Sequence, residues 1–388
     1  MRTRFLFAGL GFSLTLSAAF LAALCCRAPA PAGAAFAAAA ESPKSKGRVA
    51  RSTAEVAALI EREGKTPPAW WDSMPLEYPP GLDLSWPKDA PGPWDAGKNV
   101  GQYIWSVINE NPGKWRSGVR FLHHLLTVHK DNTAVLCKVV DALARMYCDL
   151  HQDYARAAFW WQQADKRGTL DVRAVARLAD CYWQLGNKSM AVKALGRTQR
   201  YILLEAVKLW SEMGEIAKAL ALAEALARAG MAAEAYLAAG DACRLHGRSR
   251  DALAYYNKTL AVPAAGKSKE HMARFHARAQ ASIEAVQVID ALDLGRVPDG
   301  AYTAESVAYE APLAIEVAVK KGRIESVKVT RHREKQFYSS IEAMPRRIVE
   351  RQGVKGVDAV TGATVTSEAI LNATTKALAE AMKAGARR

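Results

Sequence analysis

One spacing of small residues and glycine recurs three times along the middle of this 388-residue chain. In each copy a residue pair that includes alanine is followed three positions later by an aromatic residue or a cysteine, and four positions after that by glycine. The copies run Leu178–Gly186, Ala206–Gly214 and Ala239–Gly247, and small residues return after each glycine, at Ala191, Ala219 and Ala252. Small residues let helices approach closely, and glycine permits the tight turn that joins them. The pattern therefore predicts a series of paired helices.

A looser copy of the same pattern precedes these three, at Leu143, Ala144, Tyr147, Ala157 and Trp161. The glycines Gly186, Gly214 and Gly247 are 28 and 33 residues apart. Helix pairs that recur with a period of about 34 residues resemble the tetratricopeptide repeat. Because three or more such repeats can stack into a solenoid, we expect residues 100–290 to form an all-α helical-repeat domain. Its concave face either docks a partner or belongs to a simple spacer, and the sequence leaves both open.

The first 40 residues have the organisation of a secretory signal peptide. A short basic start, Met1–Arg4, precedes an apolar run over residues 5–24, and the alanines that follow offer Ala-x-Ala cleavage options between about Ala35 and Ala40. The apolar run is also nearly long enough to span a bilayer, so an uncleaved membrane anchor is the alternative. We expect the protein to be exported, to the periplasm or another extracytoplasmic compartment.

Residues 41–99 are rich in proline and tryptophan. Within them, Ser52–Gly64 has the pattern of a short capped helix that ends at its glycine. Eight prolines lie in residues 65–98 and exclude a regular helix there, and six of the ten tryptophans lie between Trp70 and Trp115. We expect a loop whose aromatic side chains pack on a folded surface.

The composition narrows the classes of protein further. Hydrophobic residues make up 50% of the chain, enough to bury a sizeable core. The net charge is +14, but lysine and arginine are spread along the chain and no zinc-finger or RNA-binding signature occurs, so we expect no nucleic-acid partner. His271 and His276 lie five residues apart, which is not the spacing of metal ligands on one helical face. We therefore expect no metal site.

Four cysteines follow the signal segment, and all of them fall in helical patterns: Cys137, Cys148, Cys181 and Cys243. An even number of cysteines in an exported protein permits disulfides. A buried free cysteine that acts as a small hydrophobe is the commoner role within helices. The disulfide state stays open at this point.

After Leu292 the hydrophobic period changes from about four to two. Asp299–Thr303 opens a strand, and apolar residues then alternate on both sides of a turn at Lys320–Arg323. This is the pattern of a β-hairpin with glycine in its loop. A helix-like stretch over residues 345–350 and a helix over Glu368–Ala384 follow. The C-terminal region is therefore expected to be a small α+β domain, residues 296–385.

Between the two C-terminal helices lies the motif Asp358-Ala-Val-Thr361-Gly362-Ala363-Thr364-Val-Thr366-Ser367. Gly362 permits a tight turn, and the small side chain of Ala363 lets the backbone approach a ligand closely. The free N–H groups at the start of the next helix suit a phosphate. The hydroxyl of Thr364 is placed where it can become a phosphoester oxygen. The alternative is a plain helix cap by Thr366 or Ser367.

The C-terminal residues resemble the FMN-binding domain family, which includes the covalently flavinylated subunits of the sodium-pumping NADH:quinone oxidoreductase and of the Rnf complex. The resemblance rests on Asp299-Gly300-x-Tyr302, the Lys-Gly-Arg-Ile hairpin, His332-x-Glu334 and the motif from Asp358 to Ser367. It implies that Thr364 takes FMN through a phosphoester bond and that Asp358 is the acidic residue of the family signature. It also implies that a metal-dependent flavin transferase attaches the FMN. His332 and Glu334 would lie near the ring or the ribityl chain.

These features lead us to expect an extracytoplasmic electron-transfer flavoprotein whose helical repeats hold it near a redox partner protein or a membrane oxidoreductase complex. No nicotinamide-binding Gly-x-Gly-x-x-Gly fold and no Ser-His-Asp constellation occurs, so we do not expect a stand-alone enzyme. One alternative is a non-redox adaptor built on tetratricopeptide-like repeats. Another is a basic protein that binds anionic surfaces in a salt-dependent way.

Overall fold

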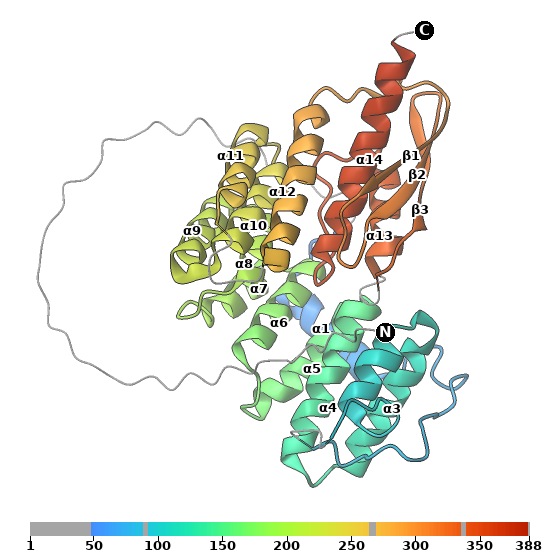
Figure 1. Ribbon diagram of the computed structural model, residues 1–388. Helices are drawn as coiled ribbons and strands as arrows, with labels where there is room; N and C mark the ends of the chain where they lie inside the picture. Colours follow the sequence, from blue (N-terminus) through green and yellow to red (C-terminus); the bar gives the residue numbers. More distant parts are fainter. Residues whose placement is uncertain (1–47, 88–91, 264–268, 335–338, 387–388) are drawn as a thin grey trace, which may run out of the picture. The chain divides into compact units, whose positions relative to one another are not determined.

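The region between residues 100 and 289 is mostly helical in the computed structural model, which describes residues 48–87, 92–263, 269–334 and 339–386 (Figure 1). All of the described residues belong to one compact unit of the chain. The predicted signal peptide, residues 1–40, lies outside the described residues.

Consecutive helices of this region pack in pairs, α4 with α5, α6 with α7, α8 with α9 and α10 with α11. The helices are α2 (Val100–Tyr103), α3 (Trp115–Val128), α4 (Thr133–Arg145), α5 (Tyr154–Lys166), α6 (Val172–Gln184), α7 (Lys188–Gly196), α8 (Leu204–Glu212), α9 (Ile216–Leu226), α10 (Ala232–Leu245), α11 (Ser249–Leu260) and α12 (Lys269–Ile289). Segments of π-helix continue α2, α4 and α9 over Ile104–Asn109, Met146–Leu150 and Ala227–Met231. The paired packing of consecutive helices confirms the prediction of helical repeats.

Glycines connect the helices of three pairs. Gly186, Gly214 and Gly247 lie between α6 and α7, α8 and α9, and α10 and α11, with φ of +90°, +81° and +67°, a left-handed conformation that glycine adopts without strain. Small residues lie where paired helices touch: a Cβ atom added to Gly240 would overlap the ring of Tyr256. The repeating pattern in the sequence thus reflects both the turns and the close helix contacts.

The first described helix, α1 (Thr53–Lys65), begins with a reciprocal cap between Ser52 and Glu55 and packs against α5. The predicted helix is present and ends at Lys65, one residue after Gly64. Gly64 makes room for the ring of Phe159, which a Cβ atom would overlap.

The segment between α1 and α2 has no regular helix in its described part, as its prolines require. Its aromatic side chains, including Trp70, Trp71 and Trp86, pack against the core of the helical region. The ring of Trp71 also contacts His123 edge-on, with 4.8 Å between ring centroids. This histidine therefore packs against the tryptophan-rich segment.

The C-terminal region contains a three-stranded antiparallel sheet in the order β1 (Gly300–Ser306), β2 (Leu313–Lys320), β3 (Arg323–Arg331). Helix α13 (Ser339–Arg351) packs on β3, and α14 (Thr364–Gly385) packs against β1, β2 and α12 (Figure 1). The expected hairpin is present, and α14 begins four residues before the predicted start at Glu368. The predicted fold class, a helical-repeat region followed by a small α+β region, is confirmed.

Within the described residues, no helix has both the length and the apolar character needed to cross a bilayer. The described histidines, cysteines and carboxylates also form no cluster of three that could hold a metal ion. Cys137, Cys148, Cys181 and Cys243 are free thiols, and the last three are buried.

Candidate functional site

The loop between α13 and α14 contains the sequence motif and is held at both ends by hydrogen bonds. Arg347 of α13 donates from Nη1 to the carbonyl oxygen of Asp358 (2.9 Å), and the Val360 N–H donates to Ser367 Oγ (3.0 Å). Gly362 has a φ of +79°, a conformation in which a larger residue would be strained. This glycine therefore sets the turn that leads into α14.

Thr364 is the first residue of α14 and lies half-buried at the open end of the helix. Ala363 is the N-cap residue and provides no side-chain cap. The hydrogen bond from the Ser367 N–H to the Ala363 carbonyl oxygen (3.0 Å) closes the first turn, so the N–H groups of Thr364, Val365 and Thr366 lie ahead of it. These groups and the helix dipole favour an anion at this position.

The interpretation of the motif as a plain helix cap is wrong, because Thr366 and Ser367 bond elsewhere. Thr366 donates its hydroxyl hydrogen to Glu334 Oε2 (2.6 Å), and Glu334 Oε1 accepts the N–H of Tyr309 (3.0 Å). Ser367 Oγ accepts its hydrogen bond from the Val360 N–H of the loop. The buried carboxylate of Glu334 therefore fixes the start of α14 to the segments that flank the sheet.

A cavity of about 440 Å³ lies beside Thr364. This volume falls within the range of roughly 300–1,000 Å³ that is typical of small-molecule sites. Residues between 358 and 368 form one side of the cavity together with Glu334, whereas α8, α10 and α12 form the other, with Leu204, Leu237 and Phe275 among the apolar residues. The cavity therefore has one wall from the motif and one from the helical repeats.

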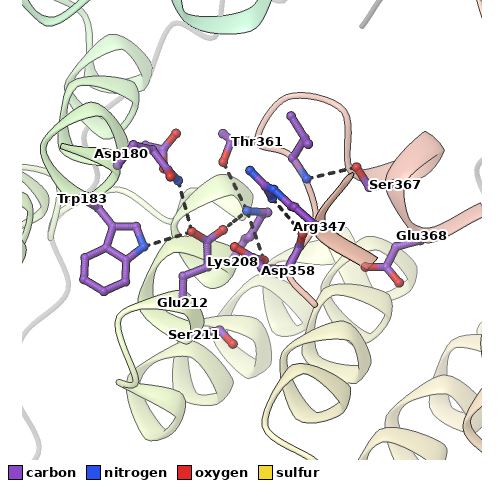
Figure 2. Close-up of polar contacts among 12 residues, drawn as sticks. Asp180, Trp183, Lys208, Ser211, Glu212, Arg347, Asp358, Thr361, Ser367 and Glu368 are labelled. Carbon is purple, nitrogen blue, oxygen red and sulfur yellow. Dashed lines mark hydrogen bonds and ion pairs between the residues drawn. The ribbon is translucent and has the colours of Figure 1, made fainter. Parts of the chain in front are cut away.

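Lys208 of α8 links the helical repeats to the motif loop, as Figure 2 shows. Its ammonium group pairs with Glu212 of the same helix and with Asp358 (3.6 Å), and it donates a hydrogen bond to Thr361 Oγ1 (3.2 Å). Glu212 also accepts from Trp183 Nε1 (3.1 Å). The carboxylate of Asp358 is thus paired with a cation of this chain.

A buried ion pair forms a second link between the two walls. Arg244 of α10 donates from Nη2 to Glu368 Oε1 of α14 (2.7 Å), and the two side chains are only 4% and 7% exposed. Burial raises the pKa of Glu368 to about 7, against the opposing effect of Arg244 and with the help of the nearby Asp241. Loss of one partner of such a pair leaves a buried charge without compensation.

Seven of the nine predicted site residues line the cavity: Glu334, Asp358, Thr361, Gly362, Ala363, Thr364 and Thr366. Ser367 lies behind this surface and holds the loop. His332 directly follows β3 and is not among the described residues that line the cavity. The structure therefore brings the motif and Glu334 together and leaves His332 outside.

The residues that sequence reasoning missed come from the helical repeats. Lys208, Arg244 and Arg278 line the cavity from α8, α10 and α12. Lys208 and Arg244 are each the one lysine or arginine of a helix with many small and apolar residues, and that is the signal that could have marked them. Helix α12 carries several other charged residues and gives no such signal for Arg278. The pattern does not say what such a cation faces, because that depends on how the C-terminal region packs.

The residues present fit a flavin mononucleotide. A phosphate suits the open end of α14, a hydroxyl is available on Thr364, and a largely apolar cavity for a ring system lies alongside.

Comparison with known proteins gives two findings. Residues 309–379 match the model of the FMN-binding domain family. An uncharacterised protein of Treponema pallidum (strain Nichols) is 39% identical over 82 residues. That similarity covers 21% of this chain and 22% of the relative, so it concerns a segment of both proteins.

The match contains Glu334, the motif loop and most of α14, which are the elements that build one side of the cavity. An FMN-binding domain supports a role in flavin binding and electron transfer. Residues 309–379 therefore match an FMN-binding domain at the C-terminus of this chain, and a helical region consistent with repeats precedes it.

Proposed function

We propose that this protein is an extracytoplasmic electron carrier in which FMN is attached covalently to Thr364. The observation that carries the proposal is the position of Thr364, whose half-buried side chain lies at the open N-terminus of α14 and lines a cavity of about 440 Å³. A phosphoester at this oxygen places the phosphate where the N–H groups of the helix favour an anion. When bound, FMN supplies transfer of one or two electrons.

The other motif residues shape and hold this position. Gly362 sets the turn, and Ala363 leaves the backbone close to the ligand, because its side chain is small. Asp358 and Thr361 are held by Lys208, and Thr366 by Glu334. These contacts hold the residues on both sides of Thr364 in place.

Attachment needs an external enzyme, since a threonine hydroxyl is a weak nucleophile. We propose a flavin transferase that uses a flavin dinucleotide. One bond forms, between Thr364 Oγ1 and the FMN phosphorus, and the pyrophosphate bond of the donor breaks to release a nucleoside monophosphate. The proton of the threonine passes to a base of the transferase.

The proposed location explains why the link is covalent. The basic and apolar start of the chain is typical of an exported protein. Outside the cytoplasm free flavin is not resupplied, so a carrier that held FMN only by contacts would lose it. A redox protein or a membrane oxidoreductase complex is the proposed partner.

The test is the variant T364V, coexpressed with a flavin transferase and exported. Wild-type protein should be yellow after denaturation and heavier by one FMN less one water. T364V should be colourless and unmodified, because valine keeps the side-chain shape without the oxygen. The matched control T303V changes an exposed hydroxyl on β1 and should keep the flavin. Wild-type protein without the adduct would leave only the non-redox adaptor.

A further inference from the structure

We propose that the ring system of the attached FMN lies in the cavity against the helical repeats, and that Arg278 of α12 is the cation that tunes its reduction potential. This inference rests on the proposed attachment at Thr364. It assigns to the repeats a part of the flavin site, where the sequence predicted only partner docking or a spacer.

The first support is the chemistry of the cavity wall that the repeats supply. Leu204, Leu237, Ala238 and Phe275 present apolar surface from α8, α10 and α12, and Tyr309 lines the cavity from the FMN-binding domain. A flat aromatic ring system needs such a surface to leave water. Because residues 361–366 line the same cavity, a flavin tethered to Thr364 is delivered directly to this wall.

The second support is the difference between Arg278 and the other cations of the cavity. Lys208 pairs with Asp358, and Arg244 pairs with Glu368. Arg278 lines the cavity without a hydrogen bond or ion pair to any residue in the described part of the chain.

The guanidinium of Arg278 lies 6.0 Å from the centroid of the Phe275 ring, a long cation–π contact. Arg278 is only partly exposed, and a cation largely removed from water is ordinarily paired with an anion. An anionic group of a ligand is therefore the partner that this arrangement lacks.

The surroundings of Arg278 agree with this assignment. Burial lowers its pKa, against the opposing effects of Asp241, Glu368 and Tyr256. Asp241 already accepts a hydrogen bond from the Tyr256 hydroxyl (2.9 Å) and Glu368 one from Arg244 (2.7 Å). A void of about 10 Å³ that also borders Arg278 has room for about one water molecule. The larger cavity is therefore the space in which Arg278 can meet a ligand.

A cation at this place has a defined consequence for electron transfer. Reduction of a flavin adds negative charge to the ring, and a charge interaction is strong in a cavity from which water is excluded. Positive charge near the ring nitrogens is one of the ways in which a protein sets the potential of a flavin. The reduction potential of the attached FMN should therefore be higher in wild-type protein than in a variant that lacks the charge of Arg278.

The experiment uses the full-length flavinylated protein and the variants R278Q, R278K and R274Q. Arg274 is exposed on the same helix and is the matched control. The mass of each variant is first measured by mass spectrometry to confirm the adduct. The midpoint potential of its flavin is then measured by redox titration. R278Q should shift the redox equilibrium at least tenfold towards the oxidised form, which is about 30 mV for a two-electron couple. R278K should recover part of the shift, and R274Q should match wild type.

The position of the ring is tested separately, by quenching of flavin fluorescence with iodide. In wild-type protein the flavin should be quenched several-fold less than free FMN. The variant A238W fills the cavity from α10 and should keep the adduct while its flavin becomes as accessible as free FMN.

The outcomes separate this inference from the proposed function. Wild-type protein without the adduct overturns both. An adduct whose ring is as accessible as free FMN, or an R278Q potential equal to that of R274Q, overturns this inference alone. A shielded ring with a lowered R278Q potential supports it.

Discussion

At the scale of single residues, several charged side chains are buried beside one another in the cavity wall. The protonation of each therefore depends on the charge of its neighbours. Glu368 is the clearest case, since a carboxyl group in the first turns of α14 is buried against Arg244 and Asp241. Its pKa of about 7 lies above the value of 4.5 for an unburied glutamate. Stability and protonation are linked wherever such a difference exists.

Glu368 should make the stability of the protein depend on pH. Between pH 4.5 and 7 the unfolded chain loses the proton while the folded chain keeps it, so the contribution of this group to stability is present below pH 4.5 and is lost as the pH rises through 7. Chemical unfolding of wild type and E368Q should show a difference in unfolding free energy that changes by at most about 3 kcal/mol across this window. A difference that stays constant with pH would contradict the shifted pKa.

Lys208 should stabilise the junction between α8 and the motif loop. The variant K208M leaves the Glu212 carboxylate, which is 2% exposed, without its cation, and removal of one partner of a buried pair costs about 3 kcal/mol. K218M is the control, because Lys218 is exposed and pairs at the surface with Glu215; its cost should be below about 1 kcal/mol. Denaturant titration measures both. Equal small losses would show that Lys208 is not structurally important.

At the scale of elements, the sequence was informative wherever a local rule decides the structure. The turns at Gly186, Gly214 and Gly247 and the hairpin at Gly322 all need a left-handed backbone, and glycine reports this directly. The looser first copy was harder to recognise because Gln152 takes the left-handed position there, with φ of +53°. The contact of Gly64 with the ring of Phe159 could not be predicted, because no local rule reports a distant contact.

The turn between α6 and α7 offers a test of how the N-terminal segment packs. A Cβ atom on Gly186 would overlap the carbonyl oxygen of Val49, whereas one on Gly230, with a similar φ of +92°, would meet open space. G230A should lose about 1–2 kcal/mol of stability from backbone strain alone, and G186A should lose clearly more. Thermal unfolding compares the two. Equal losses would mean that residues 48–51 do not pack against this turn in solution.

At the scale of the whole molecule, the sequence did not reveal that the helical repeats form half of the candidate site. The motif could be found because its residues are adjacent in the chain. Lys208, Arg244 and Arg278 precede Asp358, the first residue of the motif, by 80 to 150 positions. Their approach to the motif depends on how α14 packs against α12. Helix α14 is buried along most of its length by the sheet and by α12, which local periodicity does not show.

The measurement that tests this account most directly is peptide mass spectrometry of the protein isolated from its own host, outside the cytoplasm. With FMN attached as proposed, the peptide containing Thr364 carries FMN on that side chain and absorbs as a flavin after proteolysis. An unmodified Thr364 peptide from that material would contradict the proposed attachment, whatever the fold of the C-terminal region.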